Sequence, residues 1–340
     1  MTTPIDRRRF LAGASSVAAA AALTACSEPG SDANVSPPGV ALGPFGPEST
    51  AEEVTQGLDL TGKTALITGA NSGLGYETMR VLAMRGAKVI GTGRTAEKAD
   101  TACESIPGGL ATPAVLELSN LDSVASCAEQ VREMDTPIDM LILNAGIMAL
   151  PELEQVDGVE RQFFVNHLGH FALTVELLDR VKAAPAGRIV VLSSSGHQWA
   201  PDGGIQFDNL SGERDYDPMQ MYGQSKLANG LFAFELARRL QETSATANAV
   251  HPGIINTNLG RHFPKWQTFF ADLLGWTFMK DVPEGAATSA YVAASPLVEG
   301  MSGYYFADCN PVVPDPRMED PELAARLWTV SEEMTGVRAA

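Results

Sequence analysis

The stretch TGANSGLG, residues 68–75, decides the fold, because it lies between the apolar run TALI and a helical pattern. Glycines at positions 69, 73 and 75 permit a tight turn whose backbone can closely approach a pyrophosphate. The helix behind the turn offers free N–H groups and the positive end of its dipole to such an anion. Strand, Gly-rich turn and helix in this order predict a dinucleotide-binding unit rather than a turn that needs glycine for steric reasons alone.

Short β-rich runs alternate with helical patterns along the rest of the chain. Strands are expected at 63–69, 88–93, 112–119, 138–146, 187–195, 245–253 and 302–306, and helices at 76–87, 121–134, 159–183 and 222–240. This alternation predicts an α/β fold: a single doubly wound, Rossmann-like domain with a parallel sheet of about seven strands and helices on both faces.

The composition narrows the classes of partner. The chain has 340 residues and a formal net charge of −17, which disfavours nucleic acid and anionic lipid surfaces as ligands. Its four cysteines form no C-x-x-C pair, and His167 and His170 have no further ligand at metal-binding spacing. We therefore expect no metal, and a small molecule as the substrate; a homo-oligomer is left open.

Three zones divide the chain. Residues 1–25 carry Arg7-Arg8-Arg9-Phe10-Leu11 and then a small apolar stretch, which fits a twin-arginine signal peptide. The run ending at Cys26 resembles a lipobox, so we expect export to the cell envelope or periplasm as a membrane-anchored lipoprotein with a lipid on Cys26. Residues 26–55 predict a flexible linker and residues 56–340 the catalytic domain. A disordered Ala-rich extension is the alternative to export.

The run YGQSK contains a candidate catalytic pair. Tyr222 and Lys226 are four residues apart on an expected helix, so their side chains share one face. Interconversion of an alcohol and a carbonyl needs a proton donor or acceptor beside the carbon that exchanges hydride. A nearby cation is expected to lower the pKa of the phenol from about 10. Ser194, at the end of the strand 187–195, can hold the substrate oxygen; Ser193 and Ser195 compete with it for this role.

The spacing T-G-x-x-x-G-x-G, together with the Tyr-Lys pair, resembles the short-chain dehydrogenase/reductase family over nearly all of residues 56–340. The segments GANSGLGYET, VNHLGHFALT, YGQSKLANGLFAFELARRL and SGYYFADC are similar to the retinol-dehydrogenase-like and WW-domain-oxidoreductase-like branch. The resemblance implies an NAD(P)-dependent oxidoreductase that acts on CH–OH groups of an alcohol or carbonyl substrate, a lipophilic one in this branch.

The resemblance also assigns roles. It implies that Tyr222 is the acid/base, Lys226 positions the ribose and lowers the phenol pKa, Ser194 orients the substrate oxygen, and Asn166 holds a proton-relay water. It places Thr257 at the nicotinamide carboxamide. The residues expected to contact the cofactor are Gly69, Ser72, Gly73, Leu74, Gly75, Arg94, Leu118, Asn144, Tyr222, Lys226, Gly253 and Thr257.

The end of the second strand bears on the choice of cofactor. An acidic residue there would bind the ribose diol of NAD, but Gly93 stands in its place and Arg94 follows. A guanidinium suits the 2′-phosphate, so we expect NADP in preference to NAD, unless Arg94 is only a solvated loop residue.

Two further alternatives stay open. The aromatic-rich segment 261–281 is either a lid over an apolar substrate or ordinary core packing. The chain as a whole is either an enzyme or an envelope-anchored NADP-binding sensor or scaffold without turnover.

Overall fold

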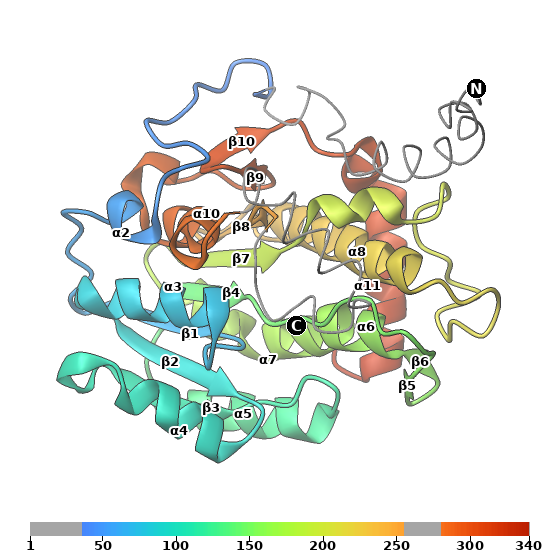
Figure 1. The fold of residues 1–340 in the computed structure, drawn as a ribbon, viewed down its shortest axis with the longest axis horizontal. Coiled ribbons are helices and arrows are strands. Elements are labelled where there is room, and N and C mark those ends of the chain that lie inside the picture. Colours follow the sequence, from blue (N-terminus) through green and yellow to red (C-terminus); the bar gives the residue numbers. More distant parts are fainter. Residues whose placement is uncertain (1–35, 255–279, 340) are drawn as a thin grey trace, which may run out of the picture.

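The structure, a computed structural model, describes residues 36–254 and 280–339 and is centred on one eight-stranded sheet (Figure 1). The strand order is β10-β9-β8-β7-β4-β1-β2-β3. Neighbouring strands pair in parallel, except that β10 is antiparallel to β9. The strands are β1 (Thr64–Ile67), β2 (Lys88–Gly93), β3 (Ala111–Val115), β4 (Met140–Leu143), β7 (Arg188–Leu192), β8 (Thr246–His251), β9 (Tyr305–Ala307) and β10 (Asn310–Val312). The predicted doubly wound fold is confirmed, with one strand more than expected.

The additional strand, β10, follows β9 through a tight turn. Asp308 and Cys309 in this turn have φ of 51° and 60°. Two successive residues with positive φ match the right-handed twist of a two-residue hairpin, a geometry usually marked in sequence by Asn-Gly or Asp-Gly. Asp-Cys lacks that signature, which explains why the sequence predicts β9 alone.

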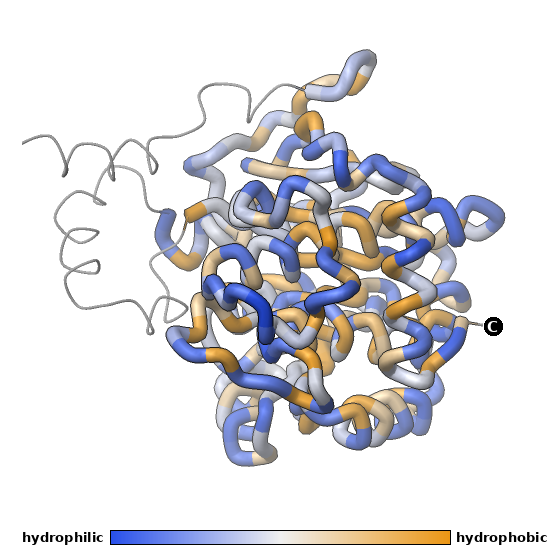
Figure 2. Tube along the Cα trace, turned by 90° about the vertical axis from the view of Figure 1, so that its right-hand side faces the viewer, coloured by the Kyte–Doolittle hydropathy of each residue, from blue (hydrophilic) through white to orange (hydrophobic). Residues whose placement is uncertain are grey.

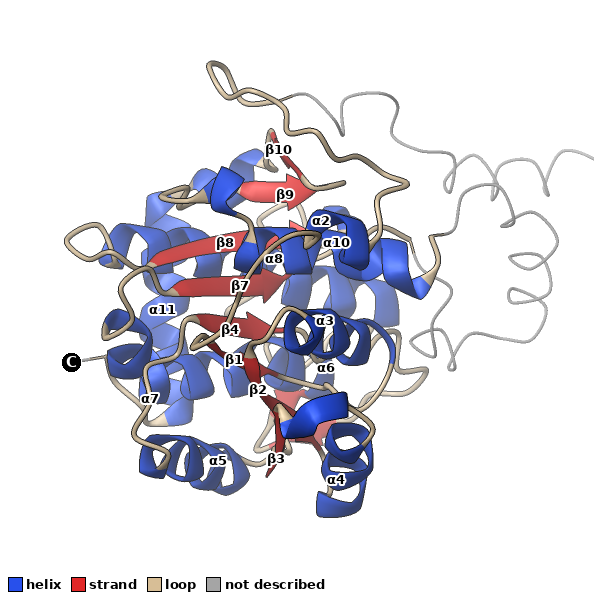
Figure 3. Ribbon diagram, turned by 90° about the vertical axis from the view of Figure 1, so that its left-hand side faces the viewer, coloured by secondary structure: helices blue, strands red, loops and turns tan. Residues whose placement is uncertain are grey.

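Helices cover both faces of the sheet (Figure 3). One face carries α2 (Ala51–Val54), α3 (Gly73–Met84), α4 (Ala96–Glu104) and α10 (Val282–Ala294). The other carries α5 (Leu121–Glu133), α7 (Gly169–Lys182), α8 (Pro218–Arg239) and α11 (Pro321–Thr335). Shorter elements are the hairpin β5–β6 (Gln155–Val156, Val159–Glu160), α6 (Arg161–Phe163), η2 (Pro107–Gly109), η3 (Phe164–Leu168), η4 (Ser195–Trp199), η7 (Pro296–Val298) and η8 (Pro316–Glu319). Within the described ranges, no helix is both long and apolar enough to cross a bilayer.

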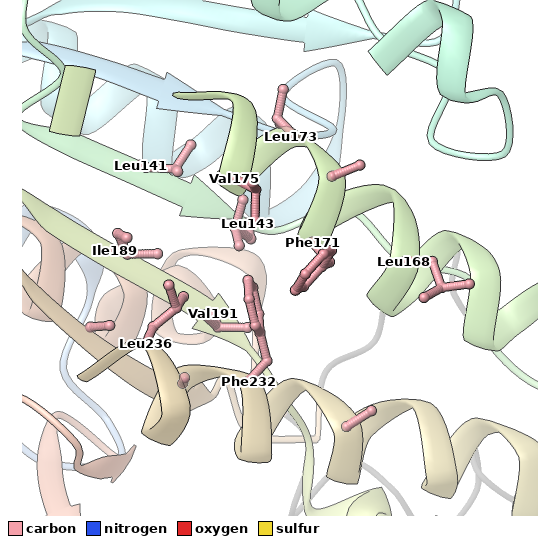
Figure 4. Packing of buried hydrophobic residues seen from close by; sticks show 14 of the residues in the cluster. Leu141, Leu143, Leu168, Phe171, Leu173, Val175, Ile189, Val191, Phe232 and Leu236 are labelled. Atoms are coloured by element: carbon pink, nitrogen blue, oxygen red, sulfur yellow. The ribbon is translucent and has the colours of Figure 1, made fainter. Parts of the chain in front are cut away.

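The apolar segments gather in the interior of the molecule, while the outer loops are mostly hydrophilic (Figure 2). Figure 4 shows part of the core, where α7 and α8 pack on β4 and β7. The rings of Phe171 and Phe232 meet there with centroids 5.5 Å apart. Each buried aromatic side chain contributes roughly 2–3 kcal/mol through burial. This packing fixes α8, which carries Tyr222 and Lys226, against the centre of the sheet.

The strand order creates a crevice beside β1. The chain builds β1, β2 and β3 outward, then returns to place β4 on the other side of β1. The connections that leave the carboxyl ends of β1 and β4 therefore run to opposite sides of the sheet. In open α/β sheets, ligands bind at such a switch point.

The segment before β1 differs from the predicted linker. The structure describes this segment from residue 36, and from Gly43 it contacts the domain: the Gly43 N–H donates to Asn310 Oδ1 at 2.7 Å, and Asn310 Nδ2 donates to the Phe45 carbonyl at 2.8 Å. Phe45 packs edge-on against Tyr291, with centroids 5.5 Å apart. A capping box at Thr50 then starts α2. The linker boundary at residue 55 is therefore wrong, because an aromatic anchor and a helix cap hold residues 43–54 on the domain.

Candidate active site

The Gly-rich turn between β1 and α3 forms a cradle that admits no side chain at its centre. A Cβ at position 75 would lie 2.4 Å from the Gly69 carbonyl oxygen and 2.5 Å from Asn144 Nδ2. Gly69 and Gly73 have φ of 67° and 57°, which favours glycine at both positions. The first turn of α3 follows directly, so its free N–H groups face the turn. These residues fit a bound pyrophosphate, as the sequence predicts.

Ser72 and Leu74 flank the start of α3. Ser72 is the N-cap residue and has an extended backbone, with no side-chain bond to the helix, and it is exposed. Its hydroxyl is therefore free to meet a ligand phosphate. Leu74 is half-buried beside it. Both positions are compatible with their predicted contact with the cofactor.

Asn144 locks the end of β4 to the turn. Its Nδ2 donates to the Thr68 carbonyl at 2.9 Å, and the N–H of the next residue, Ala145, donates to Thr68 Oγ1 at 2.9 Å. The two strands at the switch point are thus joined just where the cradle begins. Asn144 therefore supports the cofactor cradle through a hydrogen bond to the protein backbone.

Close packing at the end of β2 excludes an acidic side chain at position 93. A Cβ on the buried Gly93 would lie 2.8 Å from the amide nitrogen of Ala99 in α4. Arg94 follows and is exposed. A guanidinium at this edge of the crevice is available to a phosphate group.

Tyr222 and Lys226 lie on the inner face of α8 and are 3% and 4% exposed. Lys226 Nζ is 5.7 Å from the centroid of the Tyr222 ring and donates to the Leu192 carbonyl at 3.1 Å. A Cβ on Gly146 would lie 3.6 Å from Lys226 Nζ, so the glycine keeps the approach to the ammonium open. The structure therefore brings the predicted pair together at the end of β7.

Burial changes the expected acidity of this pair. It raises the pKa of Tyr222 to about 12, although a hydrogen bond with the Ser194 hydroxyl acts in the opposite direction. Burial also lowers the pKa of Lys226 to about 8. Burial of the phenol therefore acts against the lowering of its pKa that the sequence leads us to expect from Lys226. With a pKa of about 12, the Tyr222 phenol keeps its proton at neutral pH and so has a proton to donate.

The three serines after β7 have separate roles. Ser193 Oγ donates to the Lys226 carbonyl at 2.8 Å, and the Ser195 N–H donates to His251 Nδ1 at 3.2 Å. Ser194 caps η4, where its Oγ accepts the Gly196 N–H at 3.0 Å, and its hydroxyl faces Tyr222. The structure thus selects Ser194 as the serine beside the phenol.

Asn166 lies in η3, a single π-helical segment within the long helix predicted for 159–183. That helix begins at Arg161, because Val159 and Glu160 form β6. Asn166 Oδ1 accepts the Ile147 N–H at 2.8 Å, and both hydrogens of Nδ2 are used, by the Ile147 carbonyl and Ser225 Oγ. The side chain holds three elements together, so we expect its main-chain carbonyl to bind any relay water.

Of the remaining residues predicted to contact the cofactor, the structure describes Leu118 and Gly253. Leu118 is buried, and a Cβ on Gly169 would lie 2.9 Å from its Cβ. Gly253 has φ of 93° and follows β8, near Lys280. Thr257 lies outside the described residues, as do most of the predicted lid and Cys26.

Sequence reasoning missed several residues that shape the site. Thr92 Oγ1 accepts the Gly69 N–H at 3.1 Å, and His170 Nε2 lies 2.9 Å from Thr68 Oγ1. His251 braces the loop after β7. Thr68 precedes the turn and could have been singled out; the partners of the others are remote in sequence, so no local pattern marks them.

Comparisons with known proteins agree with this geometry. The model of the short chain dehydrogenase family matches residues 63–268. The chain is 43% identical over 295 residues to retinol dehydrogenase 14 of Homo sapiens, covering 81% of this chain and 87% of that protein. It is 40% identical over 298 residues to the WW domain-containing oxidoreductase of Pongo abelii, covering 84% of this chain and 71% of that protein.

Solved structures with a similar fold were also found. A putative uncharacterized protein from Mycobacterium paratuberculosis superposes with a TM-score of 0.69 at 34% identity, covering 84% of this chain and 98% of that one. A blue fluorescent protein from a metagenomic library, in complex with NADPH, superposes with a TM-score of 0.59 at 25% identity, covering 73% and 97%.

The chain belongs to the short-chain dehydrogenase/reductase family. It is an NAD(P)-dependent oxidoreductase that acts on CH–OH groups by hydride transfer. The predicted likeness to retinol dehydrogenases and WW-domain oxidoreductases is confirmed.

Proposed function

We propose that this enzyme transfers hydride between NADP(H) and an alcohol or carbonyl group of a small lipophilic molecule. The observation that carries the proposal is the convergence of Tyr222, Lys226, Ser194 and Asn166 at the carboxyl ends of β4 and β7, next to the nucleotide turn. The preference for NADP rests on Arg94 and on the missing acid at Gly93. The NADPH complex of a solved relative agrees with it.

The lipophilic substrate is supported by the surface beside the phenol. The ring of Trp199 is 45% exposed, and its centroid lies 6.3 Å from that of Tyr222. Gly196 makes this approach possible, because a Cβ there would lie within 2.9 Å of both rings. An apolar molecule that covers the Trp199 ring removes it from water and brings its own polar group toward Tyr222.

Each residue of the site has a separate role in the proposed reaction. Bound NADPH supplies the hydride in the reductive direction, and NADP accepts it in the oxidative one. Ser194 Oγ orients the substrate oxygen, and the Tyr222 phenol donates its proton to that oxygen as negative charge develops there. Lys226 places a positive charge close to the phenol, which stabilises the phenolate left behind. Asn166 holds the main-chain carbonyl through which a relay water can return the proton.

The Tyr222→Phe variant tests the assignment. It removes the only ionisable group of the phenol ring while keeping the ring, so we expect turnover to fall by at least about 10²-fold, with NADPH affinity nearly unchanged. Assays scan alcohols, aldehydes and ketones with NADPH and NADH, and the dissociation constants of both nucleotides are measured. Tyr216→Phe is the matched control, since Tyr216 donates only to the Leu150 carbonyl.

Three results would contradict the proposal or a part of it. Unchanged turnover in Tyr222→Phe removes the role given to the phenol. Tight NADPH binding by the unaltered protein without hydride transfer to any substrate favours a sensor or scaffold instead. A lower dissociation constant for NADH than for NADPH would overturn the assignment of Arg94.

We also propose that the enzyme is exported folded, with NADP in place, and anchored through Cys26. The support is the twin-arginine pattern at Arg7 and Arg8 in residues 1–25, which lie outside the described residues. Export in the folded state lets the domain carry a nucleotide that is scarce outside the cytosol. A bound ligand also stabilises the fold, by about 2.7 kcal/mol at a hundredfold excess over Kd.

Export has its own test. Protein from the envelope fraction is denatured, and the released nucleotide is assayed. We expect NADP or NADPH to be released without prior addition, and we expect replacement of Arg7 and Arg8 by Lys to leave the loaded protein in the cytoplasm. Empty sites in protein that binds NADP readily would contradict cofactor preloading, and unchanged export of the Lys variant would contradict the route.

A further inference from the structure

His170 is a fully buried side chain in α7 for which the reaction described above gives no role. It lies one helical turn after Asn166 and is 1% exposed. Its Nδ1 is 3.0 Å from the Asn166 main-chain carbonyl oxygen, and its Nε2 is 2.9 Å from Thr68 Oγ1. Thr68 is the last residue before the nucleotide turn. The imidazole therefore bridges two parts of the site that are 102 residues apart in sequence.

The hydrogen-bond pattern fixes the tautomer of this ring. The Asn166 carbonyl can only accept, so Nδ1 carries the proton and donates it. The neutral ring then has a lone pair on Nε2, which accepts the Thr68 hydroxyl proton. Thr68 Oγ1 in turn accepts the Ala145 N–H at 2.9 Å. Each donor in this chain has an acceptor, and the bonds run in one direction, from Ala145 through Thr68 and His170 to Asn166.

The ring stays neutral at physiological pH. Burial lowers the pKa of His170 to about 4, and the charge of Lys226 acts in the same direction. Protonation would place a second N–H on Nε2, opposite a threonine oxygen that would then have to turn its own hydrogen away. Neutrality therefore preserves the direction of the bonds.

We propose that His170 is a positioning residue that couples the nucleotide turn to the catalytic asparagine. The inference deepens the proposed function and rests on the role given there to Asn166. The His170 N–H holds the Asn166 main-chain carbonyl, the group to which the proposed mechanism assigns the relay water. Cofactor that binds at the turn holds Thr68, and the imidazole transmits this restraint to η3.

The contacts of Asn166 extend the coupling to the reacting groups. Its side chain bonds Ile147 in the segment after β4 and Ser225 in α8, the residue before Lys226. A shift of η3 therefore moves the helix that carries the ammonium. The path from the turn to Lys226 consists of four buried residues joined by hydrogen bonds of 2.9 to 3.0 Å.

Variants can cut this path at one bond. The His170→Asn side chain reaches only the place of Nδ1, so it can still donate to the Asn166 carbonyl but cannot meet Thr68. Thr68→Val removes the hydroxyl from the other end of the same bond and also the acceptor of the Ala145 N–H, whereas Thr68→Ser keeps both bonds. Thr174→Val is the matched control, because Thr174 is equally buried in α7 and its hydroxyl donates only to the helix carbonyl of His170.

The first readout is turnover. We expect His170→Asn to lower kcat about tenfold, the value of one hydrogen bond. Thr68→Val should lower kcat at least as much, because it also leaves the Ala145 N–H without its acceptor. The double variant should be no slower than the slower single variant, because both changes remove the same bond. Thr68→Ser and Thr174→Val should remain near the unaltered protein. Two outcomes would overturn the coupling. One is that the losses in kcat of the two single variants multiply in the double variant. The other is that Thr174→Val loses as much kcat as they do, in proportion to its loss of stability.

The second readout needs no substrate and so separates this inference from the proposed activity. NADPH is added to the full-length protein, and hydrogen exchange is followed in the peptide covering 161–182. We expect NADPH to slow exchange there in the unaltered protein and in Thr174→Val, and to lose this effect in His170→Asn and Thr68→Val even at saturating NADPH. Equal protection in all four proteins would refute the link, whether or not Tyr222 proves catalytic. If His170→Asn fails to fold, Thr68→Val decides the question.

Discussion

At the scale of single residues, Lys226 shows that catalytic geometry and stability compete. Its ammonium is buried beside a buried phenol, with one bond to the Leu192 carbonyl. That carbonyl also accepts a hydrogen bond from Asn229 Nδ2 at 2.8 Å, so it would keep a donor if Lys226 were replaced. A buried cation with a single protein hydrogen bond costs stability, a cost that the role proposed for this charge beside the phenol would explain.

Replacing Lys226 by Met should therefore stabilise the fold while abolishing turnover. The folded-state pKa of about 8 lies below the ordinary 10.5, so the unfolded chain binds more protons between these values and stability rises with pH across that window. Below pH 8 the buried lysine is charged, and its burial lowers the stability of the unaltered protein by the full amount. At pH 7 we therefore expect Lys226→Met to raise the free energy of unfolding by about 2–3 kcal/mol. Urea denaturation at pH 7 and pH 9.5 measures it.

The pH dependence makes this prediction specific. The gain should at least halve at pH 9.5, because the folded-state lysine is neutral there and the cost of removing its proton on folding falls as the pH approaches 10.5. Lys88→Met is the control, because Lys88 is exposed and should show no such trend. A Lys226→Met protein that is less stable at pH 7 would show that the ammonium contributes more to folding than its burial costs.

At the scale of elements, a C-terminal segment braces the loop that presents Ser194. Arg317 in η8 donates to the carbonyls of His197, Ala200 and Pro201 at 3.0 to 3.4 Å. Asp315 holds the guanidinium in place with a bond of 2.7 Å. Three carbonyls at the end of η4 thus share one planar donor, which suits the geometry of arginine. This brace sets where η4 ends and so how Ser194 faces Tyr222.

Arg317→Met should loosen η4 without unfolding the protein. We expect kcat to fall about tenfold through misplacement of the Ser194 hydroxyl, with little change in the dissociation constant of NADPH, because the nucleotide turn lies elsewhere. Steady-state kinetics with fluorescence titration separates the two effects. Arg326→Met provides a comparison, since Arg326 lies over the Phe207 ring, 4.1 Å from its centroid. Equal losses in both variants would point to a general effect of the C-terminal region.

At the scale of the whole molecule, the domain begins earlier than its family pattern indicates. Residues 43–54 lie along α10 and β10 before the chain enters β1 (Figure 1). Ala51 and Val54 are 0% and 3% exposed and belong to the core on that face of the sheet. Glu52 also pairs with Arg80 in α3 at 2.5 Å. The arm is therefore part of the fold.

Two truncations test this boundary. Removal of residues 1–42 should leave Tm within about 1 °C, whereas removal of residues 1–55 should lower it by about 5 °C, because core side chains and the bonds to Asn310 are lost. Thermal unfolding monitored by circular dichroism measures both. Equal Tm values for the two truncated proteins would mean that the arm contributes nothing to stability and that residues 43–54 belong to the linker after all.

The sequence by itself determined what depends on neighbours along the chain. Gly69, Gly73 and Gly75 mark the turn because tight backbone geometry is decided within a few residues, and the alternation of strands and helices follows from periodicity. The pairing of Tyr222 with Lys226 follows from one helical turn. The motif order along the chain then sufficed to indicate the family.

Only the tertiary structure decided what depends on burial and on contacts between remote segments. The phenol of Tyr222 is harder to ionise than the adjacent lysine suggests, because its desolvation comes from elements that pack around α8. Thr68 meets His170, and Phe45 meets Tyr291, across long stretches of sequence. Such contacts arise when helices and strands pack into one core, and no short pattern encodes them, since their free energy depends on the solvent that the whole fold excludes.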